Sequence, residues 1–351
     1  MKLYDTIIVG GGQAGLSVAY FLRRKKLDYL ILDDQSQPGG SWLHTWDSLQ
    51  LFSPSQFSSL SGWAMPKSDN EYPTKTEFIN YLEAYQEHYQ LNVKRNVRVT
   101  AVHKTNEGFK VETNKGKIYN AKTVVSCTGS AQIPFIPKYP DNEKFKGIQT
   151  HSSMYRHADD FAGKKVLVIG GGNSGAQILA EVSKVAQTSW VTLTPPTFLP
   201  DNVDGRYLFN DATDKFYGKS PIAPSGIKAT LCDIVMVDSV KEARDRDVLH
   251  AERPFSLFYE NGVIWKNGEE TPFDAVIWCT GFRANLKHLQ PLNVIVSTRV
   301  ETDYTRSVKI PSLWLVGYGS WTGFASATIY GVGKTAKRTA NEIETYLKQD
   351  E

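Results

Sequence analysis

The sequence predicts an α/β fold with two Rossmann-like dinucleotide-binding domains, one inserted into the other. Two glycine-rich loops carry this prediction: GGGQAGLSVA begins at Gly10, and GGGNSGAQIL begins at Gly170. A second internal repeat supports it, because VVSCTGS at residues 124–130 resembles VIWCTGF at residues 276–282. Each copy of this second repeat has the pattern of a buried strand that ends in Cys-Thr-Gly. We therefore expect the same nucleotide-binding unit twice in one chain.

Both loops stand between an apolar, β-branched run and a helical pattern, which is the order of a βαβ unit. The first copy predicts a strand, loop, helix and strand over residues 5–9, 10–15, 14–24 and 29–32. The second copy predicts them over residues 165–169, 170–175, 176–185 and 190–193. A long helix is expected over residues 326–347, and residues 141–146 are expected to form a surface linker. The outer domain then comprises residues 1–156 and 283–351, and the inserted domain comprises residues 157–282.

Composition indicates an ordinary cytoplasmic protein. The 351 residues are 41% hydrophobic and 22% charged, and the net charge of +3 is too small to indicate nucleic acid or an anionic membrane as a partner. No apolar run approaches the ~20 residues of a membrane-spanning helix, and the first residues lead into a strand rather than a signal peptide. Three cysteines, Cys127, Cys232 and Cys279, lack CxxC spacing, and the seven histidines form no HExxH. We expect no disulfide framework and no metal.

The glycine loops predict two pyrophosphate sites. A GxGxxG turn lets the backbone approach a pyrophosphate closely, and the start of the following helix supplies free N–H groups and the positive end of its dipole. Asp33 stands 18 residues after Gly15, at the end of the second strand, where a carboxylate binds a ribose diol and repels a 2′-phosphate. The first loop therefore suits FAD or NAD rather than NADP.

The same count from Gly175 reaches Leu193, which Thr194 follows. This loop has neither an acid that selects NAD nor an adjacent arginine that captures a 2′-phosphate. Arg206 is the next candidate, and pairing with Asp201 or Asp204 is an equally good interpretation of it. Two loops imply two dinucleotides, and the economical pair is FAD with a nicotinamide coenzyme that exchanges hydride with it. We expect both NADPH and NADH to be accepted, within about tenfold in kcat/KM.

A short segment before the second loop carries a family resemblance. FKGIQTHSSMY at residues 145–155 has the spacing FxGxxxHxxxY, and GGSW at residues 39–42 matches a GGxW motif. Nearly the whole chain thereby resembles the flavin-containing and Baeyer–Villiger monooxygenases. It is most similar to the short bacterial members that use NADH as well as NADPH, and to those associated with arsenic resistance. In this family, His151 is expected to form a hydrogen bond across the link between the domains and to couple nicotinamide binding to the flavin.

The resemblance and the loops together define the expected sites. The FAD site comprises Gly10, Gly12, Gln13, Ala14, Gly15, Asp33, Asp34, Gly40, Ser41, Trp42, Trp46, Val99, Ser320 and Trp321. The NAD(P)H site comprises Gly170, Gly172, Asn173, Ser174, Gly175, Leu193, Thr194, Arg206, Cys279, Thr280 and Gly281. Phe52 and His151 are the expected catalytic residues, and the start of the last helix is expected to face the flavin.

Two departures from the family pattern affect the chemistry. Phe52 stands where many members have an asparagine that steadies the oxygenated flavin, and Ser320 stands where many flavoproteins have an aspartate on the ribityl chain. The resemblance implies an FAD-dependent, NAD(P)H-using monooxygenase that forms a C4a-(hydro)peroxyflavin and oxygenates sulfides, amines or ketones. The alternative favoured by Phe52 is an uncoupled NAD(P)H oxidase that releases H₂O₂.

Rival functions are weaker. A disulfide reductase needs a cysteine pair that the sequence lacks, and a non-enzymatic flavin sensor would not need the second loop. The expected partners are a small-molecule substrate and O₂, and a homodimer is a further expectation.

Overall fold

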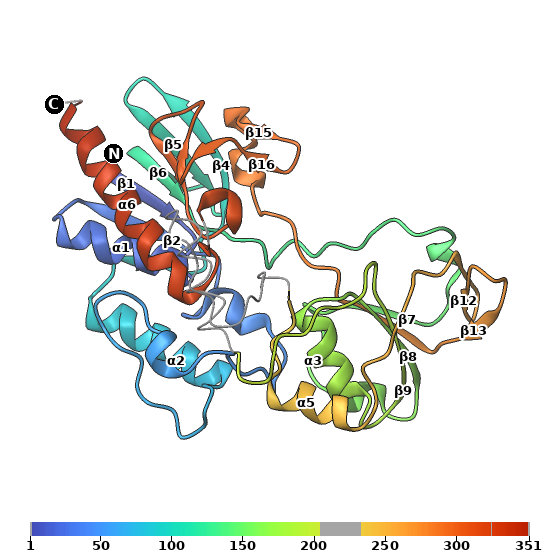
Figure 1. Ribbon diagram of the computed structural model, residues 1–351. Helices are drawn as coiled ribbons and strands as arrows, with labels where there is room; N and C mark the ends of the chain where they lie inside the picture. Colours follow the sequence, from blue (N-terminus) through green and yellow to red (C-terminus); the bar gives the residue numbers. More distant parts are fainter. Residues whose placement is uncertain (1, 204–232, 324, 350–351) are drawn as a thin grey trace.

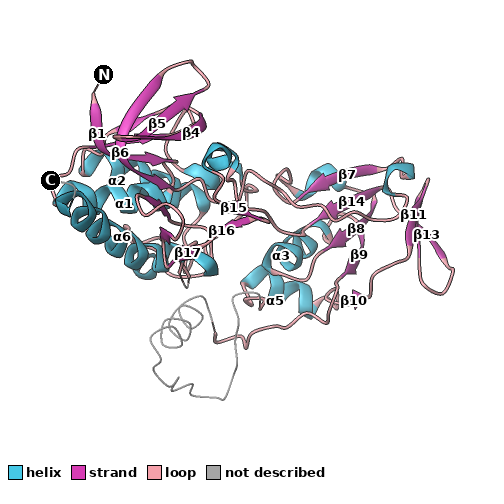
Figure 2. Ribbon diagram, turned by 90° about the horizontal axis from the view of Figure 1, so that it is seen from above, coloured by secondary structure: helices cyan, strands magenta, loops and turns pink. Residues whose placement is uncertain are grey.

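Two lobes joined by two extended segments make up the molecule (Figure 1). The computed structural model describes residues 2–203, 233–323 and 325–349. One lobe contains α1 (Gln13–Arg24) and α6 (Ile329–Gln349), and the other contains α3 (Asn173–Val182) and α5 (Asp238–Asp245). A view from above shows the two lobes side by side (Figure 2). Among these residues, none of the helices combines the length and the hydropathy of a membrane-spanning segment, and no group of three or more His, Cys, Asp or Glu is placed to hold a metal ion.

The first lobe is built on a sheet with strand order β17-β18-β19-β6-β1-β2-β3, which β4 and β5 extend through β6. Strands β3, β2, β1, β6 and β19 run parallel, as a Rossmann unit requires. Its strands are β1 (Leu3–Val9), β2 (Tyr29–Leu32), β3 (Val93–Lys94), β4 (Val99–Thr105), β5 (Gly108–Thr113), β6 (Ile118–Ser126), β17 (Thr302–Asp303), β18 (Arg306–Ser307) and β19 (Leu313–Leu315).

Helices cover one face of this sheet. They are α1 (Gln13–Arg24), α2 (Lys75–His88) and α6 (Ile329–Gln349), and α2 begins with a capping box between Thr74 and Glu77. Ile8 packs among these helices, while its neighbour Ile7 packs under β4 and β5 on the other face. Both side chains are fully buried, since successive residues of a strand point to opposite faces of the sheet.

The second lobe repeats the plan with fewer strands. Its parallel sheet has the order β10-β9-β8-β14-β7, with α3 and α5 on one face and the small antiparallel sheet β11-β12-β13 on the other. Its elements are β7 (Ile148–His151), β8 (Lys165–Ile169), α3 (Asn173–Val182), β9 (Gln187–Val191), α5 (Asp238–Asp245), β10 (Ala251–Glu252), β11 (Leu257–Tyr259), β12 (Gly262–Ile264), β13 (Glu270–Pro272) and β14 (Ala275–Trp278). A short pair, β15 (Ile295–Val296) and β16 (Arg299–Val300), lies outside both main sheets.

The two lobes are pseudo-equivalent strand by strand. In each, the residue that begins the Cys-Thr-Gly segment donates its backbone N–H to the last residue of the strand before the glycine loop: Cys127 to Val9 and Cys279 to Ile169, both at 2.7 Å. The internal repeat of the sequence therefore corresponds to a structural repeat, and the predicted fold of two Rossmann-like domains is confirmed.

Two details of the predicted organisation are wrong. β7 pairs with β14, so residues 148–151 belong to the second sheet, although the predicted boundary after residue 156 assigns them to the outer domain. Phe145 was expected in a surface linker, yet it is buried against Phe258 at a ring distance of 5.6 Å. In both cases a short segment that carries little local signal is fixed by contacts distant in the sequence.

The two connecting segments lie against each other between the lobes. Phe135 donates its backbone N–H to the Gly281 carbonyl at 2.9 Å, and Arg283 donates to the Ile133 carbonyl at 2.8 Å. The guanidinium of Arg283 also stacks over the Phe135 ring at 3.6 Å. The two connecting segments are therefore held to each other by backbone hydrogen bonds and by a cation–π contact.

Candidate functional site

The first glycine loop is a close-packed turn. Gly10 has a φ of +103°, and a Cβ on it would lie 2.6 Å from the Cys127 carbonyl oxygen. A Cβ on Gly15 would lie 2.0 Å from the Gly10 carbonyl oxygen. Only hydrogen fits at either position, which explains two of the three glycines of the motif. Gly12 is the N-cap of α1 and no side chain caps it, so the first N–H groups of the helix remain for an anionic ligand.

The second glycine loop has the same geometry. Gly170 has a φ of +137°, a Cβ on it would lie 2.2 Å from the Cys279 carbonyl oxygen, and a Cβ on Gly175 would lie 2.1 Å from the Gly170 carbonyl oxygen. Gly172 is the N-cap of α3, again without a side-chain cap. Both loops therefore offer a cradle that fits a pyrophosphate, and the residues fit the two predicted dinucleotides.

The residue that follows the second strand differs between the lobes. In the first lobe, Gly10 donates its N–H to the Leu32 carbonyl, and Asp33 is the residue after Leu32. In the second lobe, Gly170 donates its N–H to the Val191 carbonyl, and Thr192 is the residue after Val191. Thr192 is therefore the structural counterpart of Asp33. The sequence count that paired Asp33 with Leu193 is therefore one residue too long. Thr192 is 1% exposed, whereas Leu193 and Thr194 are exposed beyond the strand. The conclusion that no acid occupies this place in the second lobe still holds.

Asp33 is buried beside the first loop. It accepts a hydrogen bond from the Gly11 backbone N–H at 2.9 Å and forms an ion pair with Arg95, the residue after β3. Burial raises the pKa of Asp33, and the Gly11 N–H and the Arg95 charge oppose that rise. Arg95 was missed from the sequence, because only the pairing of β2 with β3 brings it to Asp33.

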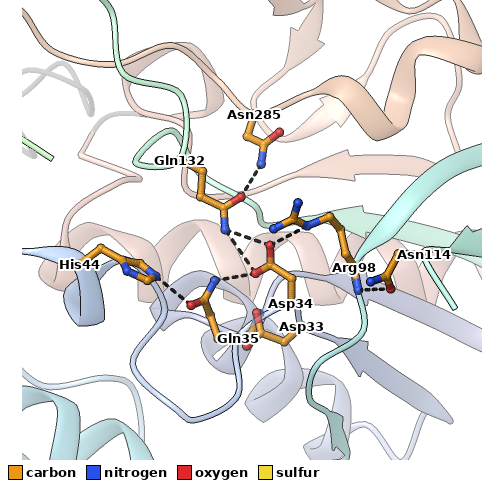
Figure 3. Close-up of polar contacts among 9 residues, drawn as sticks. Asp33, Asp34, Gln35, His44, Arg98, Asn114, Gln132 and Asn285 are labelled. Atoms are coloured by element: carbon orange, nitrogen blue, oxygen red, sulfur yellow. Dashed lines mark hydrogen bonds and ion pairs between the residues drawn. The ribbon is translucent and has the colours of Figure 1, made fainter. Parts of the chain in front are cut away.

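Asp34 belongs to a separate polar network (Figure 3). Its carboxylate accepts from Arg98 at 3.2 Å, from Gln35 at 2.7 Å and from Gln132 at 3.0 Å. Asn285 in turn donates to Gln132 at 2.9 Å. Gln132 and Asn285 come from the two connecting segments, so this network ties both segments to the end of β2.

One cavity joins the two lobes. Its volume is about 350 Å³, and its lining is mostly apolar. Three helix starts reach it: Gln13 from α1, Asn173 and Ser174 from α3, and Ile329 from α6. Gln177, one turn into α3, also lines the cavity and was not predicted from the sequence. The structure therefore brings both glycine loops and the start of the last helix to one space.

The predicted aromatic residues divide between this cavity and the cores. Trp42 and Phe52 line the cavity, and Trp42 donates its indole N–H to Gln13 at 3.0 Å. Trp46 lines it too, but its ring packs in the second lobe against Tyr155 at 6.3 Å. Trp321 does not line the cavity; it packs against Tyr318 in the core of the first lobe.

The remaining predicted residues are divided between the cavity, the glycine loops and positions away from the cavity. Ser41 lines the cavity, and a Cβ on Gly40 would lie 2.8 Å from Gly12, so the GGxW segment crosses directly over the first loop. The Asn173 side chain donates to the Asp233 carbonyl and accepts the Val235 N–H, so it holds residues 233–235. Val99, Ala14 and Ser320 are also not part of the cavity lining: Val99 is buried in the core, Ala14 is buried within α1, and Ser320 is exposed. Arg206 lies outside the described residues.

The FxGxxxHxxxY segment, residues 145–155, is held within the second lobe and against the connecting segment that follows β14. His151 is buried, accepts the Ser153 N–H at Nδ1 and therefore donates from Nε2 to the Gly281 carbonyl at 3.0 Å. Burial lowers its pKa, which keeps the ring neutral, and the bond to Gly281 opposes the shift. Tyr155 donates to Glu181 at 2.8 Å. Thr280, also predicted, donates its hydroxyl to the Phe135 carbonyl.

The described cysteines do not form a redox pair. Cys127 and Cys279 are buried free thiols at equivalent positions of the two lobes. Burial raises the pKa of Cys279 to about 12 and that of Cys127 further, so neither is a ready thiolate nucleophile at neutral pH.

Comparison with known proteins agrees with this arrangement. Residues 7–206 match the protein family described as pyridine nucleotide-disulphide oxidoreductase. The chain is 30% identical over 345 residues to the uncharacterized oxidoreductase CzcO of Bacillus velezensis, a match that covers 97% of this chain and 99% of that protein. It is 28% identical over 387 residues to the indole-3-pyruvate monooxygenase YUCCA6 of Arabidopsis thaliana, covering 98% and 91%.

Solved structures distinguish flavin monooxygenases from disulfide reductases as relatives of this chain. A flavin-containing monooxygenase from Stenotrophomonas maltophilia is 45% identical, with a TM-score of 0.92, and the match covers 99% of this chain and 100% of that chain. The bacillithiol disulfide reductase of Bacillus cereus shares only the fold, at 18% identity and a TM-score of 0.76, with coverage of 98% and 100%. FAD and NADPH, the predicted cofactors, are those of the flavin monooxygenase family, and use of NADH stays a prediction. The chain is an oxidoreductase of the pyridine nucleotide-disulphide oxidoreductase family, and within that family it belongs to the flavin monooxygenases.

Proposed function

We propose that the chain is an FAD-dependent, NAD(P)H-using monooxygenase that oxygenates a small soft nucleophile, such as a sulfide or an amine, or a ketone. The observation that carries this proposal is the single cavity reached by the starts of α1, α3 and α6. Hydride transfer requires the flavin and nicotinamide rings to meet, and this cavity is the space that both dinucleotide sites share.

The described residues support distinct tasks in this proposal. The Gly10–Gly15 turn and Asp33 hold FAD, and the Gly170–Gly175 turn holds the nicotinamide coenzyme. The start of α6 stabilises negative charge that develops on the reduced ring. When bound, the flavin accepts hydride from the coenzyme and activates O₂ for transfer of one oxygen atom to the substrate. The mostly apolar cavity lining excludes water from that transfer.

An uncoupled NAD(P)H oxidase is the second candidate, and Phe52 favours it. Its phenyl ring lines the cavity, at the position where the family resemblance implies an asparagine in many members. A phenyl ring offers no hydrogen bond to an oxygenated flavin, so part of the reducing power is then released as H₂O₂.

The test measures how the electrons of NADPH and the atoms of O₂ are divided between oxygenated product and H₂O₂. The holoenzyme is supplied with NADPH, ¹⁸O₂ and a panel of thioethers, amines and ketones, and ¹⁸O in product, H₂O₂ and NADPH consumed are measured together. A monooxygenase incorporates one ¹⁸O atom per coupled turnover. Full recovery of the electrons as H₂O₂, with no labelled product from any substrate, would establish the oxidase instead.

A cavity-filling variant locates the reaction. Ile329→Trp places an indole in the cavity and should reduce oxygenated product at least tenfold while FAD stays bound. Ile148→Trp is the matched control, because Ile148 lies on β7 of the second lobe and is 47% exposed. Equal losses in both variants would contradict the assignment of the cavity.

A further inference from the structure

Arg253 occupies the place in the second lobe that Arg95 occupies in the first. β2 pairs with β3 so that Leu32 faces Lys94, and Asp33 donates its N–H to the Lys94 carbonyl. β9 pairs with β10 in the same way: Val191 faces Glu252, and Thr192 donates its N–H to the Glu252 carbonyl at 3.0 Å. Arg95 and Arg253 are each the next residue.

The two arginines differ in their partners. Arg95 forms an ion pair with the buried Asp33 carboxylate. Arg253 lies beside Thr192, where Arg95 lies beside Asp33. The Arg253 guanidinium makes two long hydrogen bonds of 3.3 Å, to the carbonyls of Thr192 and Ala251. Among the described residues it has no ion pair with a carboxylate, and its side chain is exposed. The same structural position therefore holds a neutralised cation in one lobe and an available cation in the other.

This place is where a dinucleotide presents its adenosine ribose. In a Rossmann unit the residue at the end of the second strand contacts the ribose 2′ position, and an arginine close by accommodates a 2′-phosphate. An acid at residue 192 would repel that phosphate and neutralise the cation, but threonine does neither. Leu193 is 84% exposed beside it and offers an apolar surface to the adenine ring.

We propose that Arg253 is the residue that recognises the 2′-phosphate of NADPH, and that the exchange of aspartate for threonine at the end of the strand makes this possible. Arg253 is then a specificity residue of the coenzyme site, in the role that the sequence had suggested for Arg206. The inference rests on the nicotinamide role of the second lobe in the proposed function, but not on the oxygenation chemistry.

The test measures binding with fragments of the coenzyme. Adenosine 2′,5′-bisphosphate and 5′-AMP differ by the 2′-phosphate alone, and their affinities for the FAD-loaded protein are measured by calorimetry. The wild-type protein should bind the bisphosphate up to about tenfold more tightly than 5′-AMP. Arg253→Ala should remove this difference and leave 5′-AMP binding unchanged, and Arg253→Lys should restore part of it.

A second variant tests the exchange itself. Thr192→Asp recreates the pair found in the first lobe, so it should abolish bisphosphate selectivity while 5′-AMP still binds. Arg246→Ala is the matched control, because Arg246 contacts the Ala180 and Ser183 carbonyls at the far end of α3. Flavin content and thermal midpoints confirm that each variant is folded.

Two results would overturn the proposal. If Arg253→Ala weakens both nucleotides equally, the guanidinium stacks on the adenine instead of binding phosphate. If neither affinity changes, another residue recognises the 2′-phosphate. Failure of the proposed oxygenation would appear differently, as normal nucleotide selectivity without labelled product.

Discussion

The two glycine loops have the same backbone and very different surroundings. Gly11 is buried, Asp33 and Arg95 close one side of the first loop, and the Gly40 segment crosses over it. Gly171 is exposed, and a Cβ on Gly172 would meet nothing within 4 Å. The close-packed glycines shape the pyrophosphate cradle in both lobes, while the covering segments distinguish them. A covered loop suits a resident cofactor, and an open loop suits a coenzyme that must leave after each turnover.

The largest expected difference comes from adding one methyl group to each loop. Gly15→Ala forces a Cβ to within 2.0 Å of a carbonyl oxygen beneath a covered site, so we expect a loss of about 4 kcal/mol or more in the free energy of unfolding and no retained flavin. Gly175→Ala makes an equivalent clash, at 2.1 Å from the Gly170 carbonyl oxygen, so it should destabilise the second lobe by a similar amount without entering the FAD site. It should keep FAD but slow flavin reduction by NADPH about a hundredfold. Flavin content and anaerobic stopped-flow reduction measure both, and similar behaviour of the two variants would remove the distinction.

The cover over the first loop should be sensitive to loss of Arg95. Arg95→Ala leaves a buried carboxylate without its ion-pair partner, which costs about 3 kcal/mol at neutral pH. Burial raises the pKa of Asp33 in the folded protein above the ordinary carboxyl value. Below the ordinary pKa, the protonated carboxyl therefore contributes to the stability of the fold, and this stabilisation is lost as the pH rises through the folded pKa. The variant should therefore approach wild-type stability near pH ~4 and fall behind it as the pH rises.

Arg98→Ala is the control for that series. Arg98 pairs with Asp34 at 3.2 Å, but its side chain is 66% exposed, so we expect a change within about 1 kcal/mol. Thermal midpoints of both variants between pH 4 and 8 give the comparison. A pH-independent loss in Arg95→Ala would contradict the assigned cause.

A carboxylate introduced at the N-cap glycine should weaken binding of a different ligand in each lobe, with little effect on the stability of the fold. Gly172→Asp has room for its side chain and should fold with FAD bound, but its charge should weaken NADPH binding about tenfold or more. Gly12→Asp should reduce flavin occupancy instead, because its side chain enters beside Gly40 in the covered site. Calorimetry with NADP⁺ and flavin absorbance measure the two effects, and Gly172→Ala serves as the neutral control. Full flavin occupancy in Gly12→Asp would refute the assignment of the first loop to FAD.

Phe52 tests the space between the loops. We expect a large share of NADPH electrons to appear as H₂O₂ in the wild type, and Phe52→Asn should lower that share severalfold by adding an amide to the cavity lining. Phe52→Leu controls for the loss of the ring. An unchanged ratio of H₂O₂ to NADPH in Phe52→Asn would show that this position does not govern coupling.

The smallest expected effect is the choice between coenzymes. One exposed cation at residue 253 and no acid at residue 192 favour NADPH only modestly, so kcat/KM for NADPH and NADH should stay within about tenfold of each other. Steady-state kinetics with both coenzymes check this. A preference of a hundredfold or more would require further 2′-phosphate contacts beyond Arg253.

The sequence by itself determined the repeated Rossmann unit, the two close-packed glycine turns and the carboxylate of Asp33 at the end of β2. These follow from local patterns, because strand periodicity and the steric demand for glycine act over a few residues. Only the tertiary structure decided that β7 belongs to the second sheet, that Thr192 rather than Leu193 corresponds to Asp33, and that Arg95 and Arg253 stand beside those positions. Strand pairing sets these relations across tens of residues, and no local pattern records which strand lies next to which.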